Sequence, residues 1–136
     1  LIYAANWDEV PKVTFWDKLD YIGVDMYASI SSEKFPTLDA LKLGAKKAIQ
    51  PFLDLAKKLG KRLWFTEVGY RSTISSFVQP HIWPFDLDPA DRAYDELSQA
   101  LGLIAFLEAV RTSNVVEGVF FWKWFTFSTN CKINGN

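Results

Sequence analysis

The stretch Arg62-Leu-Trp-Phe-Thr-Glu-Val-Gly-Tyr-Arg-Ser72 decides the fold of this chain. It opens with an apolar run, Leu63 to Phe65, which is too short and too rich in β-forming residues for a helix and therefore predicts a buried strand. The strand ends on a carboxylate, Glu67, and Gly69 then lets the backbone turn sharply. For this acid taken alone, an ion pair with Arg71 would be the simplest explanation. The ends of the other strands favour a functional carboxylate instead.

The composition is that of a globular domain with one core. The 136 residues are 49% hydrophobic and 23% charged, with a formal net charge of −1. The interspersed charges indicate neither a nucleic-acid partner nor an anionic membrane, and no apolar run reaches the roughly 18 residues of a membrane span. With one histidine, His81, and one cysteine, Cys131, no cluster has metal-ligand spacing, so no metal or other cofactor is expected. The cysteine leaves the cellular compartment open.

Four strands are predicted along the chain, at Leu1–Trp7, Tyr21–Tyr27, Leu63–Val68 and Gly118–Trp124. Because Leu1 already lies inside a strand, we expect the sequence to be a piece of a longer chain. Helical segments separate the strands, and this alternation predicts parallel pairing through right-handed crossovers. Strands that are apolar on both faces further predict a sheet covered on both sides.

The helices have clear start and stop signals. A short helix is predicted near Phe15–Lys18, and a long one from the cap Thr37 to Gly60, which Pro51 should kink or split. The run Asp88-Pro89-Ala90-Asp91 predicts the start of a third helix that ends near Arg111. Its predicted buried stripe consists of Tyr94, Leu97, Leu101, Ile104 and Leu107.

The loop from Tyr70 to Leu87 is long enough to suggest a functional role. Its aromatic residues, which argue against disorder, are Phe77, His81, Trp83 and Phe85. The tail from Phe125 to Asn136 is predicted to be a polar loop.

Polar or aromatic residues follow or end every predicted strand: Asn6, Trp7, Asp25, Tyr27, Glu67, Trp122 and Trp124. Chemistry gathered at the carboxyl ends of parallel strands is typical of (β/α)8-barrel active sites. Four βα units are too few to close such a barrel. An open, doubly wound sheet is less favoured because no glycine-rich phosphate loop follows any strand.

Four segments resemble the last four strands of barrel glycoside hydrolases, and most closely the β-mannanase-like family 113 of the retaining clan. They are Tyr-Ala-Ala-Asn-Trp (3–7), Leu-Asp-Tyr-Ile-Gly-Val-Asp-Met-Tyr (19–27), Phe-Thr-Glu-Val-Gly-Tyr-Arg-Ser (65–72) and Phe-Phe-Trp-Lys-Trp (120–124). The resemblance implies an α/β fold in which residues 1–136 form the second half of a TIM barrel, strands 5 to 8, without the final helix.

The resemblance also implies roles for the strand ends. Glu67 matches the catalytic nucleophile, Tyr27 the hydroxyl beside it, and Trp122 the platform under the sugar. Residues that would line the cleft by hydrogen bonds or stacking are Asn6, Trp7, Asp25, Arg71 and Trp124. Together with Tyr27, the Arg71 cation would stabilise the ionised form of Glu67. The implied reaction is hydrolysis of a β-linked polysaccharide, mannan first, with retention of configuration.

One part of the family pattern is missing from the chain. The acid/base glutamate of the family ends strand 4, whereas a retaining enzyme needs two carboxyl groups about 5–5.5 Å apart. Asp25 could be proposed in its place, but the family pattern puts no acid/base there. The chain by itself is therefore expected to be inactive.

Two alternatives remain open at this point. The chain could be a non-catalytic carbohydrate-binding or structural remnant. It could also complete a barrel with the missing N-terminal half or with a second copy, because an open four-stranded sheet leaves two unpaired edges and an apolar face.

Overall fold

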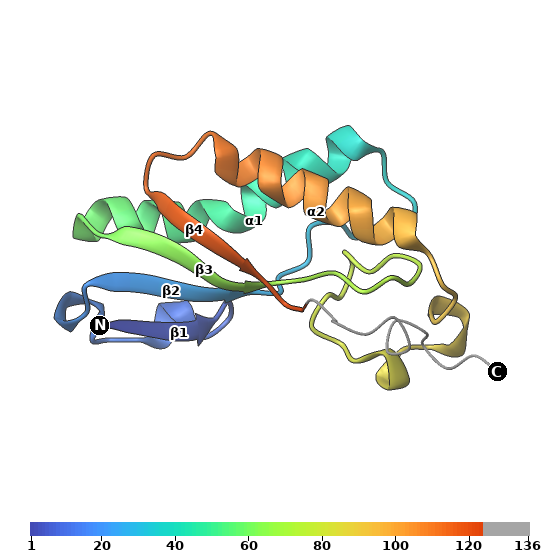
Figure 1. Cartoon of the computed structure of the whole chain (residues 1–136), viewed down its shortest axis with the longest axis horizontal. Helices are drawn as coiled ribbons and strands as arrows, with labels where there is room; N and C mark the ends of the chain where they lie inside the picture. The colour runs from blue at the N-terminus through green and yellow to red at the C-terminus, as the bar shows by residue number, and fades with distance from the viewer. Residues whose placement is uncertain (124–136) are drawn as a thin grey trace.

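The computed structural model describes residues 1–123 and contains one sheet of four parallel strands (Figure 1). The strands are β1 (Ile2–Asn6), β2 (Tyr21–Met26), β3 (Arg62–Val68) and β4 (Val116–Phe121), and they lie side by side in chain order. The predicted parallel order is confirmed. Strand β4 begins two residues earlier than predicted and ends at Phe121, and Trp124 and the predicted tail loop lie outside the described residues.

Both long helices, α1 (Leu38–Leu59) and α2 (Glu96–Arg111), cover the same face of the sheet (Figure 1). Two 3-10 turns, η1 (Val10–Lys12) and η2 (Trp16–Lys18), join β1 to β2 where one short helix was predicted. Two more, η3 (Pro84–Asp86) and η4 (Pro89–Asp91), lie between β3 and α2. In the described part of the chain the prediction of a sheet covered on both faces is therefore wrong, and the second face is open.

The core lies between the sheet and the helices. The side chains of β2 and β3 that point into it are Ile22, Val24, Met26, Leu63, Phe65 and Val68. Phe65 is at the centre, with its ring 6.5 Å from that of Phe52 on α1 and 5.1 Å from that of Phe106 on α2. Edge-to-face contacts of this kind tie both helices to the middle of the sheet.

Helix α1 begins and ends where its sequence signals predict. The Thr37 side chain accepts a hydrogen bond from the Ala40 N–H at 3.2 Å, and Gly60 adopts φ 63° at the other end. The helix continues through Pro51, so of the predicted kink or split the split is wrong. Pro51 and Lys47 lie on the exposed side of α1. Water can therefore hydrogen-bond the Lys47 carbonyl that a proline ring leaves without its helical donor.

Helix α2 begins seven residues later than its predicted start at Pro89. The Asp88 carboxylate does accept a hydrogen bond from the Ala90 N–H at 3.0 Å, but this turn ends at Asp91. Residues 93–95 are held extended by hydrogen bonds from Ile74 N–H to Ala93 O and from Asp95 N–H to Ser72 O. The loop after β3 thus prevents the helix from starting earlier, and Asp95 is its N-cap.

Most of the predicted buried stripe of α2 faces away from the core, and of its members only Leu101 packs against the core. Leu97 is 65% exposed, Ile104 45% and Leu107 41%, and Tyr94 precedes the helix and is also exposed. The buried face consists mostly of small residues: Ser98, Gly102, Ala105, Phe106, Ala109 and Val110. The helix is apolar all round, so periodicity could not select its inner face. The face with small side chains is the buried one because it lets α2 approach the ring of Tyr70 and the sheet closely.

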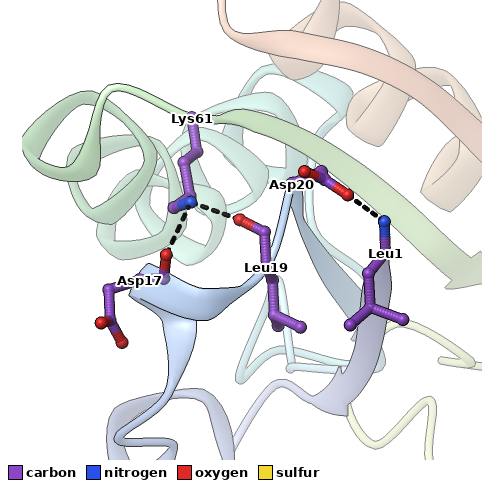
Figure 2. A network of polar contacts seen from close by, with 5 residues as sticks. All are labelled: Leu1, Asp17, Leu19, Asp20 and Lys61. Carbon is purple, nitrogen blue, oxygen red and sulfur yellow. Dashed lines mark hydrogen bonds and ion pairs between the residues drawn. The ribbon is translucent and has the colours of Figure 1, made fainter.

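Polar contacts join the amino-terminal ends of the strands, at the edge opposite Glu67 (Figure 2). Lys61, directly before β3, donates to the carbonyl oxygens of Asp17 and Leu19 in the segment that leads into β2. The Asp20 N–H donates to the Leu1 carbonyl oxygen at 2.9 Å. These contacts align three strands at the edge that carries no candidate chemistry. Within residues 1–123, no helix is long and apolar enough to cross a membrane.

The cap of α2 gives a test of this fold. We expect Asp95→Ala to lower the free energy of unfolding by about 1 kcal/mol, because the carboxylate accepts hydrogen bonds from Leu97 N–H and Ser98 Oγ. The control Asp88→Ala should cost less, since Asp88 caps only one 3-10 turn. Urea unfolding of both variants measures the difference, and equal losses would place the start of the helix at Asp88.

The same cap predicts a pH dependence. The hydrogen bond from Ser98 lowers the pKa of Asp95 below its ordinary value. The stabilisation is therefore complete above that ordinary value and is lost as the pH falls through the lower folded-state pKa. The difference between wild type and Asp95→Ala should accordingly shrink in acid.

Candidate active site

An irregularity in strand pairing turns Glu67 toward the open face of the sheet. Val24 pairs with Phe65, but the next residue, Asp25, pairs with Glu67, so β3 has one extra residue, Thr66, at this point. Strict alternation would have put Glu67 on the helix side with Leu63 and Phe65. After the bulge, Val68 takes the buried position instead, and Glu67 shares the face of Asp25. Bulges often re-aim side chains beside active sites.

The Glu67 carboxylate has one neutral donor in the described structure. The Tyr27 hydroxyl, just beyond β2, donates to Glu67 Oε2 at 2.9 Å. Burial, strengthened by this hydrogen bond and by the charges of Glu67 and Asp25, raises the pKa of Tyr27 well above its usual range. Tyr27 therefore remains a protonated donor at any physiological pH. Glu67 itself is partly exposed, and the Tyr27 hydroxyl holds one of its two carboxylate oxygens, Oε2.

Asp25 is held by the bulge residue. Thr66 Oγ1 donates to Asp25 Oδ1 at 2.8 Å, and Asp25 is the register partner of both Asn6 on β1 and Glu67 on β3. Trp7 continues the edge, because its N–H donates to the Asp25 carbonyl at 3.1 Å and its ring lies 6.3 Å from that of Tyr27 at 72°. Five of the residues expected at the site thus meet at one edge: Asn6, Trp7, Asp25, Tyr27 and Glu67.

Trp122 follows β4 at the same edge. Its N–H donates to the Val68 carbonyl at 2.9 Å, its side chain is half exposed, and Lys123 Nζ lies 5.6 Å from its ring centre. The Trp122 carbonyl lies so close to Gly69 that a Cβ there would overlap it. Gly69 has no positive φ. It is needed for this close approach and not for the sharp turn that the sequence suggested.

Arg71 lies in a different environment from the one expected. Its Nη1 donates to three carbonyl oxygens of the following loop, those of Gln79 at 2.9 Å, Pro80 at 3.0 Å and Ile82. Among the described residues no ion pair joins it to Glu67. Burial lowers the pKa of this guanidinium below its usual value. Arg71 therefore fixes the shape of the loop, which a four-residue spacing could not reveal.

The loop after β3 brings a further ring, that of His81, next to the site, and the site residues predicted from the sequence did not include it. The ring of His81 lies 5.1 Å from that of Trp7, and the rings of Trp83 and Phe85 are stacked on each other. The signal that could have found them was the density of aromatic residues in a long loop.

The arrangement suits chemistry at an open surface. A carboxylate with one fixed oxygen and a neutral phenol beside it can act as a nucleophile or as a base. Two surface hollows, of about 390 and 200 Å³, are not lined by Glu67 or Tyr27. Within residues 1–123, no group of three or more His, Cys, Asp or Glu side chains could hold a metal ion.

The chain is similar to known proteins over nearly its whole length. The model of Glycoside Hydrolase Family 113 matches residues 1–132. No curated protein sequence matches the chain.

Three solved structures share the fold, each covering 90% of this chain. One is a family 113 β-1,4-mannanase with 24% identity and a TM-score of 0.71, and a complex structure of a family 113 β-1,4-mannanase has 23% identity and a TM-score of 0.72. The β-mannanase AaManA from Alicyclobacillus acidocaldarius, in complex with ManMIm, has 22% identity and a TM-score of 0.65. The chain spans about a third (34%) of the length of each. The parallel four-stranded sheet is accordingly the fold of part of a TIM barrel.

The contact at Gly69 is testable. Gly69→Ala should lower the free energy of unfolding by at least about 2 kcal/mol, because its Cβ would overlap a backbone carbonyl, which cannot move aside as the end of a flexible side chain can. The control Gly60→Ala has open space around its Cβ and should cost only about 1 kcal/mol for a left-handed backbone. Amide exchange of residues 116–121 should rise in the first variant only. Equal exchange in both would show that β4 does not depend on Gly69.

Proposed function

The chain belongs to glycoside hydrolase family 113, and on this premise we propose that it carries the nucleophile half of a retaining β-mannanase. The observation behind the proposal is the bulge that turns Glu67 to the open face, where the Tyr27 hydroxyl donates to one of its oxygens. In this proposal Glu67 acts as nucleophile toward a β-1,4-linked mannan. The substrate follows from the β-1,4-mannanases that share the fold.

The proposed reaction takes two displacements. Glu67 Oε1, which is free of the Tyr27 bond, attacks the anomeric carbon. The bond to the leaving sugar oxygen breaks while an acid outside the 136 residues of this chain, in the other half of the barrel, protonates that oxygen. The resulting glycosyl ester on Glu67 is then hydrolysed by water, which the same outside group deprotonates. Two inversions give net retention.

The neighbouring residues would serve binding. Trp122 is proposed as the platform under the sugar at the cleaved bond, with Asn6, Trp7 and Asp25 along the rim. Trp124 shares this proposed role but lies outside the described residues. Arg71 is proposed to act indirectly, by holding the loop in place, because its Nη1 donates to carbonyl oxygens of the loop.

The open face of the sheet favours completion of the barrel by a further half. Ile2, Tyr21 and Phe120 are exposed on it, and the Trp64 ring lies 5.5 Å from that of Phe120 in a stacked pair. An apolar face bounded by two unpaired strand edges is costly in water. We propose that strands 1 to 4 of the same protein cover it and bring the acid/base carboxyl group near Glu67.

The nucleophile role predicts a chemical rescue. In the completed barrel, meaning the protein that contains both this chain and strands 1 to 4, Glu67→Ala should abolish hydrolysis of mannan oligosaccharides. With an aryl β-mannoside, added azide should restore turnover and give the α-mannosyl azide, because a single displacement inverts the anomeric carbon. NMR identifies the anomer. Undiminished turnover of mannan oligosaccharides by Glu67→Ala would refute the assignment, and sugar binding without hydrolysis by the wild type would favour a non-catalytic protein.

The Tyr27 hydrogen bond predicts a defect in kcat. Tyr27→Phe should lower kcat by about 10- to 100-fold with less change in KM, since one donor that orients the nucleophile is lost. Tyr21→Phe is the matched control, because it makes the same change at the other end of the same strand. Equal kcat values for the two variants would remove Tyr27 from the proposed mechanism.

The open face predicts association of the 136-residue chain on its own. Light scattering should show oligomers, and Phe120→Asp should shift them toward monomers by putting a charge on the open face. Leu43→Asp, at a comparably exposed position on α1, should leave the mass unchanged. A wild-type chain that is a stable monomer would contradict this prediction.

A further inference from the structure

We propose that Trp83 and Phe85 form an aromatic platform that binds the polysaccharide chain beyond the sugar held at Glu67. The proposal extends the proposed function and rests on it for the identity of the polymer. The two rings lie 6.1 Å apart at an interplanar angle of 13°. Trp83 is 55% exposed and Phe85 70%, so each ring leaves much of its surface to solvent. Adjacent large aromatic side chains at the surface often mark a binding site.

The platform is held in place before any ligand binds. Arg71 clamps the preceding residues through three carbonyl oxygens, the last of them that of Ile82. On the other side, Arg92 Nη2 donates to the Phe85 carbonyl at 2.8 Å and its Nε to the Leu87 carbonyl at 3.0 Å. The turn η3 between them is closed by Asp86 N–H donating to Trp83 O at 2.9 Å. A pre-ordered loop loses little conformational entropy on binding.

A series of contacts leads from the proposed nucleophile to the loop that carries the platform. Glu67 accepts from Tyr27, the Tyr27 ring meets that of Trp7, and Trp7 meets His81, two residues before Trp83. The turn η3 lies beyond the carboxyl ends of the strands, on the side of the sheet away from the helices (Figure 1). A polymer held at Glu67 can therefore extend along this edge.

The chemistry of the rings selects the class of ligand. The face of an aromatic ring is electron-rich and attracts groups with partial positive charge. A β-linked mannopyranose carries its axial hydrogens at carbons 1, 3 and 5 on one face, and its axial 2-hydroxyl on the other. β-Linked glucopyranose has the same apolar face. The platform should therefore bind mannan and β-1,4-glucan chains equally, and selection for mannose must occur elsewhere.

The test separates affinity from catalysis. In the completed barrel carrying Glu67→Gln, so that no substrate is consumed, titration calorimetry measures binding of mannobiose, mannohexaose and cellohexaose. Adding Trp83→Ala should weaken both hexasaccharides by a similar factor of about ten and leave mannobiose unchanged. Trp83→Tyr should restore most of the loss. Phe15→Ala, an exposed aromatic position between η1 and η2 that is far from the loop in sequence, is the control and should change no affinity.

Each outcome bears on the platform separately from Glu67. Equal hexasaccharide affinity with and without Trp83→Ala would overturn the platform, and so would an equal loss with Phe15→Ala. A loss for mannohexaose alone would overturn the claim that the platform does not distinguish the two sugars. If hydrolysis survives replacement of Glu67, the nucleophile assignment fails while a tenfold effect of Trp83→Ala still supports the platform.

Discussion

The single extra residue in β3 is the constraint on which the candidate site depends. A β-strand alternates its side chains, so Glu67 would follow Leu63 and Phe65 into the core, where an unpaired carboxylate is very costly. The bulge at Thr66 exchanges the two residues that follow it: Val68 enters the core and Glu67 leaves it. The same extra residue donates to Asp25, so the irregularity is stabilised by a contact within the site that it creates.

The polar residues around Glu67 determine which donor its carboxylate receives. Tyr27 is kept protonated by burial and serves only as a donor to Glu67. Arg71, the nearest cation in sequence, is directed away by the carbonyl oxygens of the loop. The carboxylate is therefore held by a neutral hydroxyl and is not neutralised by an ion pair among the described residues. That arrangement suits a nucleophile, because its charge remains available to a substrate.

The two faces of the sheet differ in a way that follows from the part of the barrel represented here. One face packs against α1 and α2 around Phe65, as in any βα unit. The other carries exposed apolar residues such as Tyr21 and Phe120, next to the partly buried Trp64. In a closed barrel this second face is the filled interior. Apolar residues on both faces of the strands were therefore read correctly, but they reflect a barrel interior and not a second layer of helices.

The sequence by itself determined the strands, their parallel order and the edge at which the chemistry collects. These depend on local patterns: short apolar runs, caps such as Thr37, and strand ends that parallel pairing must bring together. Tertiary structure alone decided the facing of Glu67, the inner side of α2, the late start of that helix at Asp95 and the partners of Arg71. Each of these depends on contacts between segments distant in the chain. For Glu67 and for α2 the sequence also has no regular hydrophobic period that points to one face, because β3 contains a bulge and α2 is apolar all round. A pattern of hydrophobicity can say that a residue is in a strand or helix, but only packing can say which way it points.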